Sequence, residues 1–122
     1  MAGVPFVYEM LDRIGFLKKE YPSLRYVTQA GGRLRNSLIK KFALYAKSCD
    51  IEFFVMYGQT EATARMSFFK TNDYLDKIGS IGRPIPGGNI VLSPSSEIVY
   101  SGRNVMLGYA ENREELNKGD VN

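Results

Sequence analysis

The sequence predicts an α/β fold in which a parallel sheet with crossover helices is followed by a β-hairpin. Two short segments rich in aromatic and β-branched residues, 24–29 and 53–57, have the composition of strands. Between them, apolar residues recur at three-and-four spacing, which is typical of an amphipathic helix. Two further apolar runs, 90–92 and 97–100, flank a Ser-Pro-Ser-Ser turn and predict the hairpin.

Residues 5–20 are predicted to form the first helix. Pro5 suits the first helical turn, and Gly15 weakens the pattern toward the end of the segment. The apolar residues with helical spacing are Phe6, Tyr8, Met10, Leu11, Ile14 and Leu17. Packing against a core is sufficient to explain this helix.

Segment 24–29 is predicted to be a strand that ends at a pair of glycines. It follows the break formed by Tyr-Pro-Ser at 21–23. Gly31 and Gly32 permit positive φ angles and the close approach of a ligand to bare backbone. The same pair also suits a tight turn from strand to helix, so the residues alone leave both roles open.

A second helix is predicted to begin at Asn36, whose side chain can cap the free amides of the first turn. Its apolar face contains Leu38, Ile39, Phe42, Tyr45 and Ala46, and its lysines lie largely on the opposite face. A strand, a helix and a strand in this order favour a right-handed parallel crossover. The two strand ends should then emerge at one edge of the sheet and share a crevice, where open α/β sheets bind ligands.

A dense polar cluster follows the strand at 53–57. Tyr57 offers a flat ring, Thr60 a hydroxyl and Glu61 a carboxylate, which suit a base, a phosphate and a metal ion respectively. Magnesium commonly takes one or two protein carboxylates together with water and substrate phosphates. Two structural alternatives remain open: Tyr57 as a core aromatic, and Thr60 with Glu61 as the capped start of a short helix.

The C-terminal half is predicted to be less regular. Residues 70–90 are punctuated by glycine and proline and are predicted to be a loop, which either only connects or closes over a ligand. A turn and a short helix are expected near 112–116, and 118–122 have loop composition.

Composition excludes several classes of function. The net charge of +3 comes from basic residues that alternate with acidic ones, so we expect no nucleic-acid partner. Histidine is absent, which excludes Ser-His-Asp and Cys-His nucleophiles and histidine metal sites. No apolar tract approaches the roughly 20 residues that span a bilayer. The single cysteine and the lack of a signal sequence predict a cytoplasmic protein of about one domain.

Four segments carry a family resemblance over residues 24–112. In chain order they are Gln29-Ala30-Gly31-Gly32, Tyr57-Gly58-Gln59-Thr60-Glu61, the loop Gly79-Ser80-Ile81-Gly82-Arg83-Pro84-Ile85-Pro86-Gly87, and Glu97-Ile98-Val99-Tyr100-Ser101-Gly102 with Asn104-Val105-Met106-Leu107-Gly108-Tyr109. Together they resemble the AMP-forming adenylating enzymes, the superfamily of acyl-CoA synthetases, peptide-synthetase adenylation domains and luciferases.

The resemblance implies a nucleotide site with magnesium. Its implied cofactor-binding residues are Gly31, Gly32, Arg33, Tyr57, Gly58, Gln59 and Thr60, with Arg33 at a position that the family varies. Glycines 31 and 32 and the ring of Tyr57 would hold adenine. Thr60 would contact the α-phosphate and Glu61 would bind Mg²⁺, which makes these two the candidate catalytic residues.

The implied reaction is that of an ATP-dependent, AMP-forming acid–thiol ligase. A carboxylic acid reacts with ATP to give acyl-AMP and pyrophosphate, and a thiol, usually that of coenzyme A, then takes the acyl group. The family's phosphate loop, ribose-binding aspartate and catalytic lysine are not found here, and Asp120 lacks the expected Thr-Gly-Asp context. We therefore expect an inactive fragment of a larger enzyme, whose missing remainder would complete the site.

The expected organisation is a single fragment, 1–122, of the adenylating-enzyme N-terminal domain with a partial parallel sheet. Residues 1–70 would form the β-α-β portion with the nucleotide site, and 71–122 the loop, the hairpin and the terminal segment. The hairpin is shorter than is usual in the family, and Ser96 stands where the family has glycine.

An alternative hypothesis is a free-standing, non-catalytic module that binds adenine nucleotide or a protein partner. Such a module should bind ATP or AMP and lose that binding when Tyr57 is replaced by alanine. A sheet cut from a larger domain would instead expose an edge and apolar surface, so self-association of a fragment is also expected.

Overall fold

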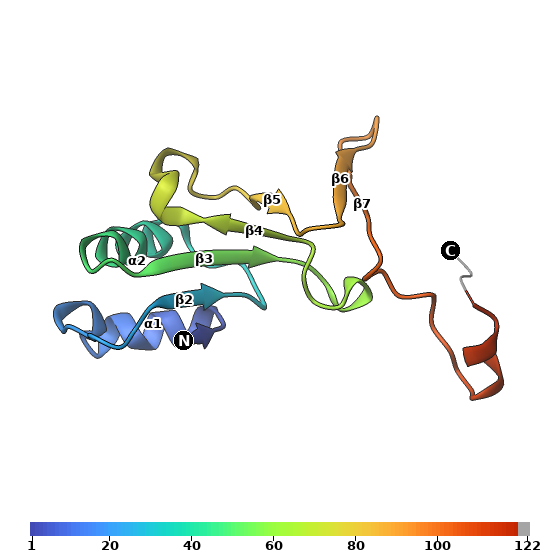
Figure 1. The fold of residues 1–122 in the computed structure, drawn as a ribbon, viewed down its shortest axis with the longest axis horizontal. Coiled ribbons are helices and arrows are strands. Elements are labelled where there is room, and N and C mark those ends of the chain that lie inside the picture. The colour runs from blue at the N-terminus through green and yellow to red at the C-terminus, as the bar shows by residue number, and fades with distance from the viewer. Residues whose placement is uncertain (120–122) are drawn as a thin grey trace. The chain divides into compact units, whose positions relative to one another are not determined.

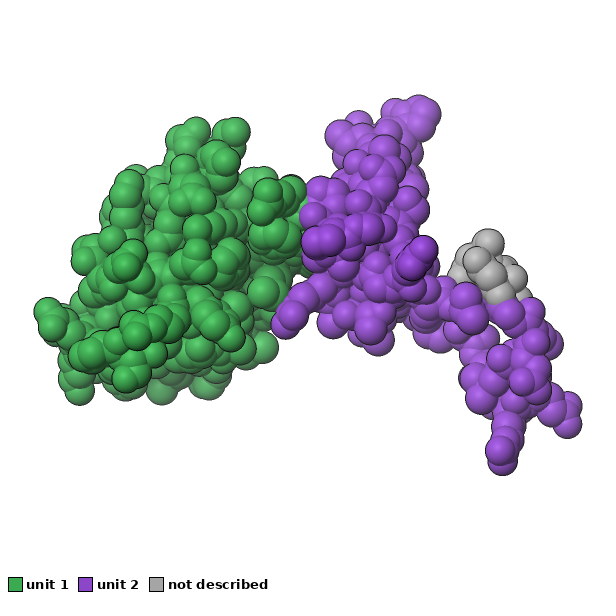
Figure 2. Space-filling view, viewed as in Figure 1, with its two compact units in different colours: residues 1–57, 67–83 green, residues 58–66, 84–122 purple. Residues whose placement is uncertain are grey.

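The computed structural model describes residues 1–119, and these form two compact units that we treat separately. The first unit contains residues 1–57 and 67–83, and the second contains 58–66 and the described residues from 84 onward (Figure 2). The chain therefore leaves the first unit after Tyr57, returns at Ser67, and leaves it again after Arg83. Asp120, which the sequence analysis compared with the ribose-binding aspartate, and most of the loop expected at 118–122 lie outside the described residues.

The first unit is built on a mixed sheet with the strand order β1-β2-β3-β4-β5 (Figure 1). Its strands are β1 (Ala2–Gly3), β2 (Tyr26–Gln29), β3 (Glu52–Tyr57), β4 (Ser67–Lys70) and β5 (Arg83–Pro84). β2 pairs in parallel with both β1 and β3, which confirms the parallel crossover between the two predicted strands.

The antiparallel strand β4 extends the predicted parallel strands and makes the sheet mixed. It pairs with β3 so that Tyr57 lies opposite Ser67 and Phe54 opposite Lys70. The segment that follows is also more ordered than the predicted loop at 70–90, because it contains the 3₁₀ turns Thr71–Asp73 and Leu75–Lys77. The sequence of β4, Ser67-Phe68-Phe69-Lys70, has two adjacent apolar residues and no alternation of apolar and polar ones, which explains why this strand was not predicted.

The first helix, α1, spans Pro5–Arg13 and is shorter than the predicted 5–20. Gly15 has φ 74°, in the left-handed region where glycine replaces other residues at little cost, and it separates α1 from a 3₁₀ turn at Phe16–Lys18. The glycine that weakened the helical pattern therefore ends the helix.

The second helix, α2, spans Asn36–Ser48. Arg35 occupies the N-cap position with extended backbone angles, and no side chain caps the first turn. The prediction that Asn36 caps this helix is therefore wrong, since Asn36 is the first helical residue. The predicted apolar face is confirmed, and its buried residues are Leu38, Ile39, Phe42, Ala43 and Ala46.

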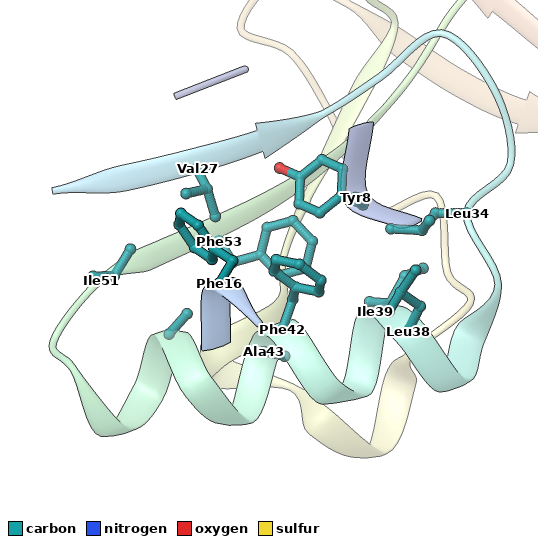
Figure 3. Packing of buried hydrophobic residues seen from close by; sticks show 11 residues of the cluster. Tyr8, Phe16, Val27, Leu34, Leu38, Ile39, Phe42, Ala43, Ile51 and Phe53 are labelled. Carbon is teal, nitrogen blue, oxygen red and sulfur yellow. The ribbon is translucent and has the colours of Figure 1, made fainter. Parts of the chain in front are cut away.

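One aromatic cluster joins both helices to the sheet (Figure 3). The ring of Tyr8 on α1 meets Phe42 of α2 edge-on at 4.9 Å and stacks with Phe53 of β3 at 5.5 Å. Its hydroxyl donates a hydrogen bond of 2.8 Å to the carbonyl oxygen of Thr28 on β2. Tyr8 is fully buried, and this burial raises the pKa of its phenol. The first helix is thus a packing element, as its pattern indicated.

The second unit contains the predicted hairpin. Strands β6 (Asn89–Leu92) and β7 (Ile98–Ser101) pair antiparallel, with Leu92 opposite Ile98. Two 3₁₀ turns, at Thr60–Ala62 and Glu114–Asn117, also belong to this unit. The short helix expected near 112–116 is therefore a 3₁₀ turn. Over residues 1–119, no helix has the length and apolar content that a membrane crossing requires.

Replacement of Tyr8 by phenylalanine should lower the free energy of unfolding by about 1 kcal/mol. The change keeps the buried ring but leaves the carbonyl of Thr28 without its tyrosine donor. Urea unfolding followed by circular dichroism measures this difference. Tyr26→Phe is the matched control. Tyr26 is 55% exposed, so loss of its hydroxyl should change the free energy of unfolding by less than about 0.5 kcal/mol. Equal stability of Tyr8→Phe and the wild type would contradict the role given to this hydroxyl.

Candidate functional site

Two predicted site segments of the first unit lie at the same end of the sheet. β2 and β3 run parallel, with Gln29 opposite Val55, so that β2 ends at Gln29 and β3 continues two residues further to Tyr57. The glycine pair follows β2 and the tyrosine ends β3. Open α/β sheets bind ligands at the carboxyl ends of such strands.

The turn after β2 is held by the side chain of Gln29. This side chain is buried, and its Nε2 donates hydrogen bonds to the carbonyl oxygens of Ala30 at 3.2 Å and Gly32 at 2.8 Å. Gly31 and Gly32 have φ angles of 73° and 149°, so both use the conformational freedom that the sequence analysis expected of them. Gln29 acts here as a turn-holding residue, a role that its place in the motif did not reveal.

The two glycines also leave room for the start of α1. A Cβ atom on Gly31 would lie 3.1 Å from a methyl group of Val4, and one on Gly32 would lie 3.2 Å from Pro5. Gly31, Gly32 and Arg33 are nevertheless exposed. The turn thus has a structural reason for its glycines, while its backbone stays accessible to a ligand.

Tyr57 is exposed at the end of β3, with 37% of its surface accessible. Of the five apolar residues that form the predicted strand at 53–57, only Phe53 is fully buried. The ring of Phe54 contacts the ring of Phe68 on β4. The alternative hypothesis that Tyr57 is a core aromatic is therefore wrong. Its ring is available to a planar ligand.

In the second unit, residues 58–66 form a compact loop. The backbone N–H groups of Ala62 and Ala64 both donate to the carbonyl oxygen of Gln59, at 3.1 Å and 2.9 Å. A Cβ atom on Gly58 would lie only 2.6 Å from the carbonyl oxygen of Ala64. Gly58 is therefore required by the fold of its own loop, a reason that the sequence motif did not indicate.

Thr60 begins the 3₁₀ turn of this loop but does not cap it. Gln59 is the N-cap residue, and no side chain makes a capping hydrogen bond there. Gln59 and Thr60 are both exposed. The capping alternative for Thr60 is not supported, and its hydroxyl is accessible to a ligand.

The carboxylate of Glu61 is held by a tyrosine that lies far along the chain. The hydroxyl of Tyr109 donates a hydrogen bond to Oε1 of Glu61, and this bond, followed by a backbone hydrogen bond, holds the pKa of Glu61 below its usual range. The same contact raises the pKa of Tyr109. Because hydrogen bonding to the charged form favours ionisation, Glu61 is a carboxylate at neutral pH and suits a cation.

Asn104 connects the loop at 58–66 to the segment after the hairpin. Its side-chain Nδ2 donates to the backbone carbonyl oxygens of Ala62 at 2.6 Å and Arg65 at 2.8 Å. Its backbone carbonyl oxygen accepts a hydrogen bond of 2.5 Å from the hydroxyl of Thr63. The hydroxyl of Tyr100 donates to Oδ1 of Asn104 at 2.7 Å. Both Asn104 and Tyr109 belong to the last motif of the family resemblance, but no local pattern in the sequence indicates a role for either residue.

The donor set fits magnesium. Among residues 1–119, no three acidic, cysteine or histidine side chains gather closely enough to enclose a metal ion. Glu61 provides one ionised carboxylate, which suits an ion that keeps part of its water and takes its other ligands from phosphates. A closed structural site of the zinc type is excluded for the described part of the chain.

A cavity of about 350 Å³ in the first unit lies away from these residues. It is lined by β4 and the segment after it, including Tyr74, Lys77 and Arg83. The cations of Lys77 and Arg83 lie over the rings of Tyr74 and Phe68, at 5.4 Å and 4.9 Å. This cavity is not the predicted crevice beside Gly31, Gly32 and Tyr57, and that crevice stays a prediction.

A family model and a curated relative both match this chain and agree with each other. The family model of AMP-binding enzymes matches residues 1–110. The 2-succinylbenzoate–CoA ligase of Listeria innocua is 24% identical over 99% of this chain, and the match spans 26% of that ligase. This chain thus covers about a quarter of the curated relative's length.

Solved structures show the same fold. The N-terminal domain of FACL13 from Mycobacterium tuberculosis matches 96% of this chain and 31% of its own, with a TM-score of 0.71 and 22% identity. The o-succinylbenzoate coenzyme A synthetase (MenE) of Bacillus subtilis, solved with ATP and magnesium ion, matches 96% of this chain and 25% of its own, with a TM-score of 0.66 and 22% identity.

Replacement of Gly58 by alanine should disturb the loop at 58–66. The added methyl group would meet the backbone of Ala64 and Arg65 at 2.6–2.8 Å, so the loop must shift. Amide NMR spectra should show chemical-shift changes throughout 59–65. Gly87→Ala is the control: its φ of 82° makes alanine costly there as well, but no atom lies within 4 Å of the new methyl group. A Gly58→Ala spectrum unchanged over 59–65 would contradict this loop geometry.

Proposed function

The chain belongs to the family of AMP-binding enzymes, and from that membership we propose that it is the central part of an ATP-dependent, AMP-forming acid–thiol ligase of the acyl-CoA synthetase kind. The observation that carries the proposal is the arrangement of the motif Tyr57–Glu61. An exposed aromatic ring ends a strand, and an ionised carboxylate follows four residues later in an exposed loop. The relative named as a CoA ligase aligns with nearly the whole chain.

The proposed reaction has two steps. A carboxylate oxygen of the acid attacks the α-phosphorus of ATP, and pyrophosphate leaves with the electrons of the broken P–O bond. The sulfur of coenzyme A then attacks the acyl carbon of acyl-AMP, and AMP leaves. The acid and coenzyme A are the proposed substrates of the complete enzyme, and ATP supplies the leaving groups of both steps.

Tyr57 and the glycine pair would hold the base. Adenine would lie on the exposed ring of Tyr57 and against the backbone of Gly31 and Gly32, with Arg33 next to the pair. A base stacked on an aromatic side chain contributes about 1–3 kcal/mol to binding. The turn beside β2 is fixed by Gln29, so its backbone would be in place before the ligand arrives.

Thr60 and Glu61 would act on the phosphates. Gly58 and Gln59 shape the loop that presents Thr60, whose hydroxyl would donate to an α-phosphate oxygen, where negative charge grows during the first step. Glu61 would bind Mg²⁺ through its carboxylate. When bound, the ion neutralises phosphate charge and orients the leaving pyrophosphate. Thr60 and Glu61 are therefore the proposed catalytic residues.

The complete activity requires residues that this chain does not contain. The chain covers about a quarter of the curated relative's length, and the phosphate loop and the lysine that the resemblance implies are not among its residues. We propose that the chain is inactive alone, that it associates with the remainder of the enzyme or with itself, and that the parent is cytoplasmic.

The purified 122-residue chain should show no ATP–pyrophosphate exchange above background. The control is the product of the complete reading frame that contains the chain, assayed with a panel of carboxylic acids. Exchange by the complete product alone supports the proposal. Exchange by the short chain would contradict its proposed inactivity, and in-frame stop codons that bracket the chain would favour a free-standing nucleotide-binding module instead.

In the complete product, Tyr57→Ala should weaken ATP binding about 5- to 150-fold, which corresponds to the loss of one stacked base. Equilibrium dialysis with labelled ATP measures the change. Tyr26→Ala provides the control, because it removes an exposed tyrosine ring from β2 instead. If the two variants bind ATP equally well, the adenine role of Tyr57 is wrong.

A further inference from the structure

We propose that Asn104 and Tyr109 are positioning residues for Glu61: Asn104 fixes the backbone of the loop at 58–66, and Tyr109 fixes the carboxylate. This inference rests on the proposed role of Glu61 as the magnesium ligand and adds two residues to it. Separate variants test the metal role of Glu61 and the positioning roles of Asn104 and Tyr109.

The loop depends on contacts from outside itself. Thr63 and Ala64 have φ angles of 54° and 64°, in a region that costs non-glycine residues about 1 kcal/mol or more. Such a conformation persists only where surrounding contacts determine it. The backbone bonds within the loop run from Ala62 and Ala64 to Gln59, and from Arg65 to Ala62 at a long 3.4 Å. The carbonyl oxygens of Ala62 and Arg65 can therefore accept a stronger bond from a donor outside the loop.

Asn104 supplies that donor. One side-chain amide reaches the carbonyl oxygens of both Ala62 and Arg65, on either side of the two strained residues. The hydroxyl of Thr63 returns a bond to the backbone of Asn104. The amide itself is oriented by Tyr100, whose hydroxyl donates to its oxygen. This position requires two hydrogen-bond donors and one acceptor on a short side chain, and asparagine provides all three.

Met106 bonds the backbone of Glu61, and Tyr109 bonds its side chain. The backbone N–H of Met106 donates to the carbonyl oxygen of Glu61 at 2.8 Å, and the hydroxyl of Tyr109 donates to its side-chain Oε1. These bonds fix the residue and the direction of its carboxylate, whose Oε2 would be the oxygen that meets a cation. Carboxylates that bind metals are commonly held by such outer hydrogen bonds, and loss of one typically weakens metal affinity 10- to 100-fold.

The probe is Mn²⁺, a paramagnetic substitute for Mg²⁺, added to the ¹⁵N-labelled 122-residue chain. In the wild type, Mn²⁺ should broaden the amide signals nearest Glu61 first, those of residues 60–62 and of Met106, and Glu61→Gln should abolish that broadening. Tyr109→Phe should require about 10-fold more Mn²⁺ for the same broadening. Tyr26→Phe, which removes the hydroxyl of an exposed tyrosine in the first unit, should match the wild type.

The role of Asn104 has a readout that needs no metal. Asn104→Ala should speed hydrogen exchange at the amides of Ala62 and Ala64 and should also weaken Mn²⁺ broadening. Asn104→Asp keeps the acceptor for Tyr100 but loses both donor bonds, so its exchange should resemble that of the alanine variant. Asn112→Ala is the control, because the side chain of Asn112 accepts a hydrogen bond from the nearby backbone N–H of Glu115 and, within the described residues, makes no hydrogen bond to the loop at 58–66.

Each contrary result has a separate meaning. Absent broadening in the wild type, or broadening that survives Glu61→Gln, would refute the metal role of Glu61 and with it the role of Tyr109. Unchanged or tighter Mn²⁺ binding in Tyr109→Phe would overturn the positioning role of Tyr109 alone, and tighter binding would show that its hydroxyl competes with the cation. Wild-type amide exchange in Asn104→Ala or Asn104→Asp would overturn the role of Asn104.

Discussion

The buried hydrogen bond from Tyr8 to Thr28, and the rings packed around it, determine the arrangement of the first unit. Tyr8 belongs to α1, its hydroxyl bonds β2, and its ring contacts α2 through Phe42 and β3 through Phe53. Four elements therefore meet at one side chain (Figure 3). A buried hydroxyl without a partner is costly, so this contact selects one arrangement of the elements. The ends of β2 and β3, which bear the proposed adenine-binding residues, follow from it.

The second unit depends on a different kind of contact. Here the side chain of Asn104 bonds carbonyl oxygens that lie 42 and 39 residues before it in the chain. The loop at 58–66 buries Ala62 and Met66, but its strained residues are exposed, and hydrogen bonds from the segment at 104–109 determine its conformation. The two ends of the proposed nucleotide motif are thus stabilised by different contacts: Tyr57 ends a packed strand, and Glu61 lies in a hydrogen-bonded loop.

The sequence predicted the elements whose signal is local. The helical face of α2, the strands β2 and β3 and the hairpin of β6 and β7 all follow from periodicity and turn residues. The strand β4 has two adjacent phenylalanines and no alternation of apolar and polar residues, so it has no local strand signal. The prediction of Asn36 as a cap is wrong because residues that suit a cap also occur inside a first turn. Motif residues placed the candidate site at a strand end, but the reason for Gly58 and the contacts of Asn104 and Tyr109 are long-range and leave no local pattern.

We propose that Tyr57 and the glycine pair lie against adenine in the complete enzyme. The decisive experiment is cross-linking of the complete gene product with 8-azido-ATP, followed by mass spectrometry of the labelled peptides. Label is expected on the peptides that contain Tyr57 or Gly31–Gly32, with protection by unlabelled ATP. ATP-protected label confined to other peptides would contradict the proposed nucleotide site.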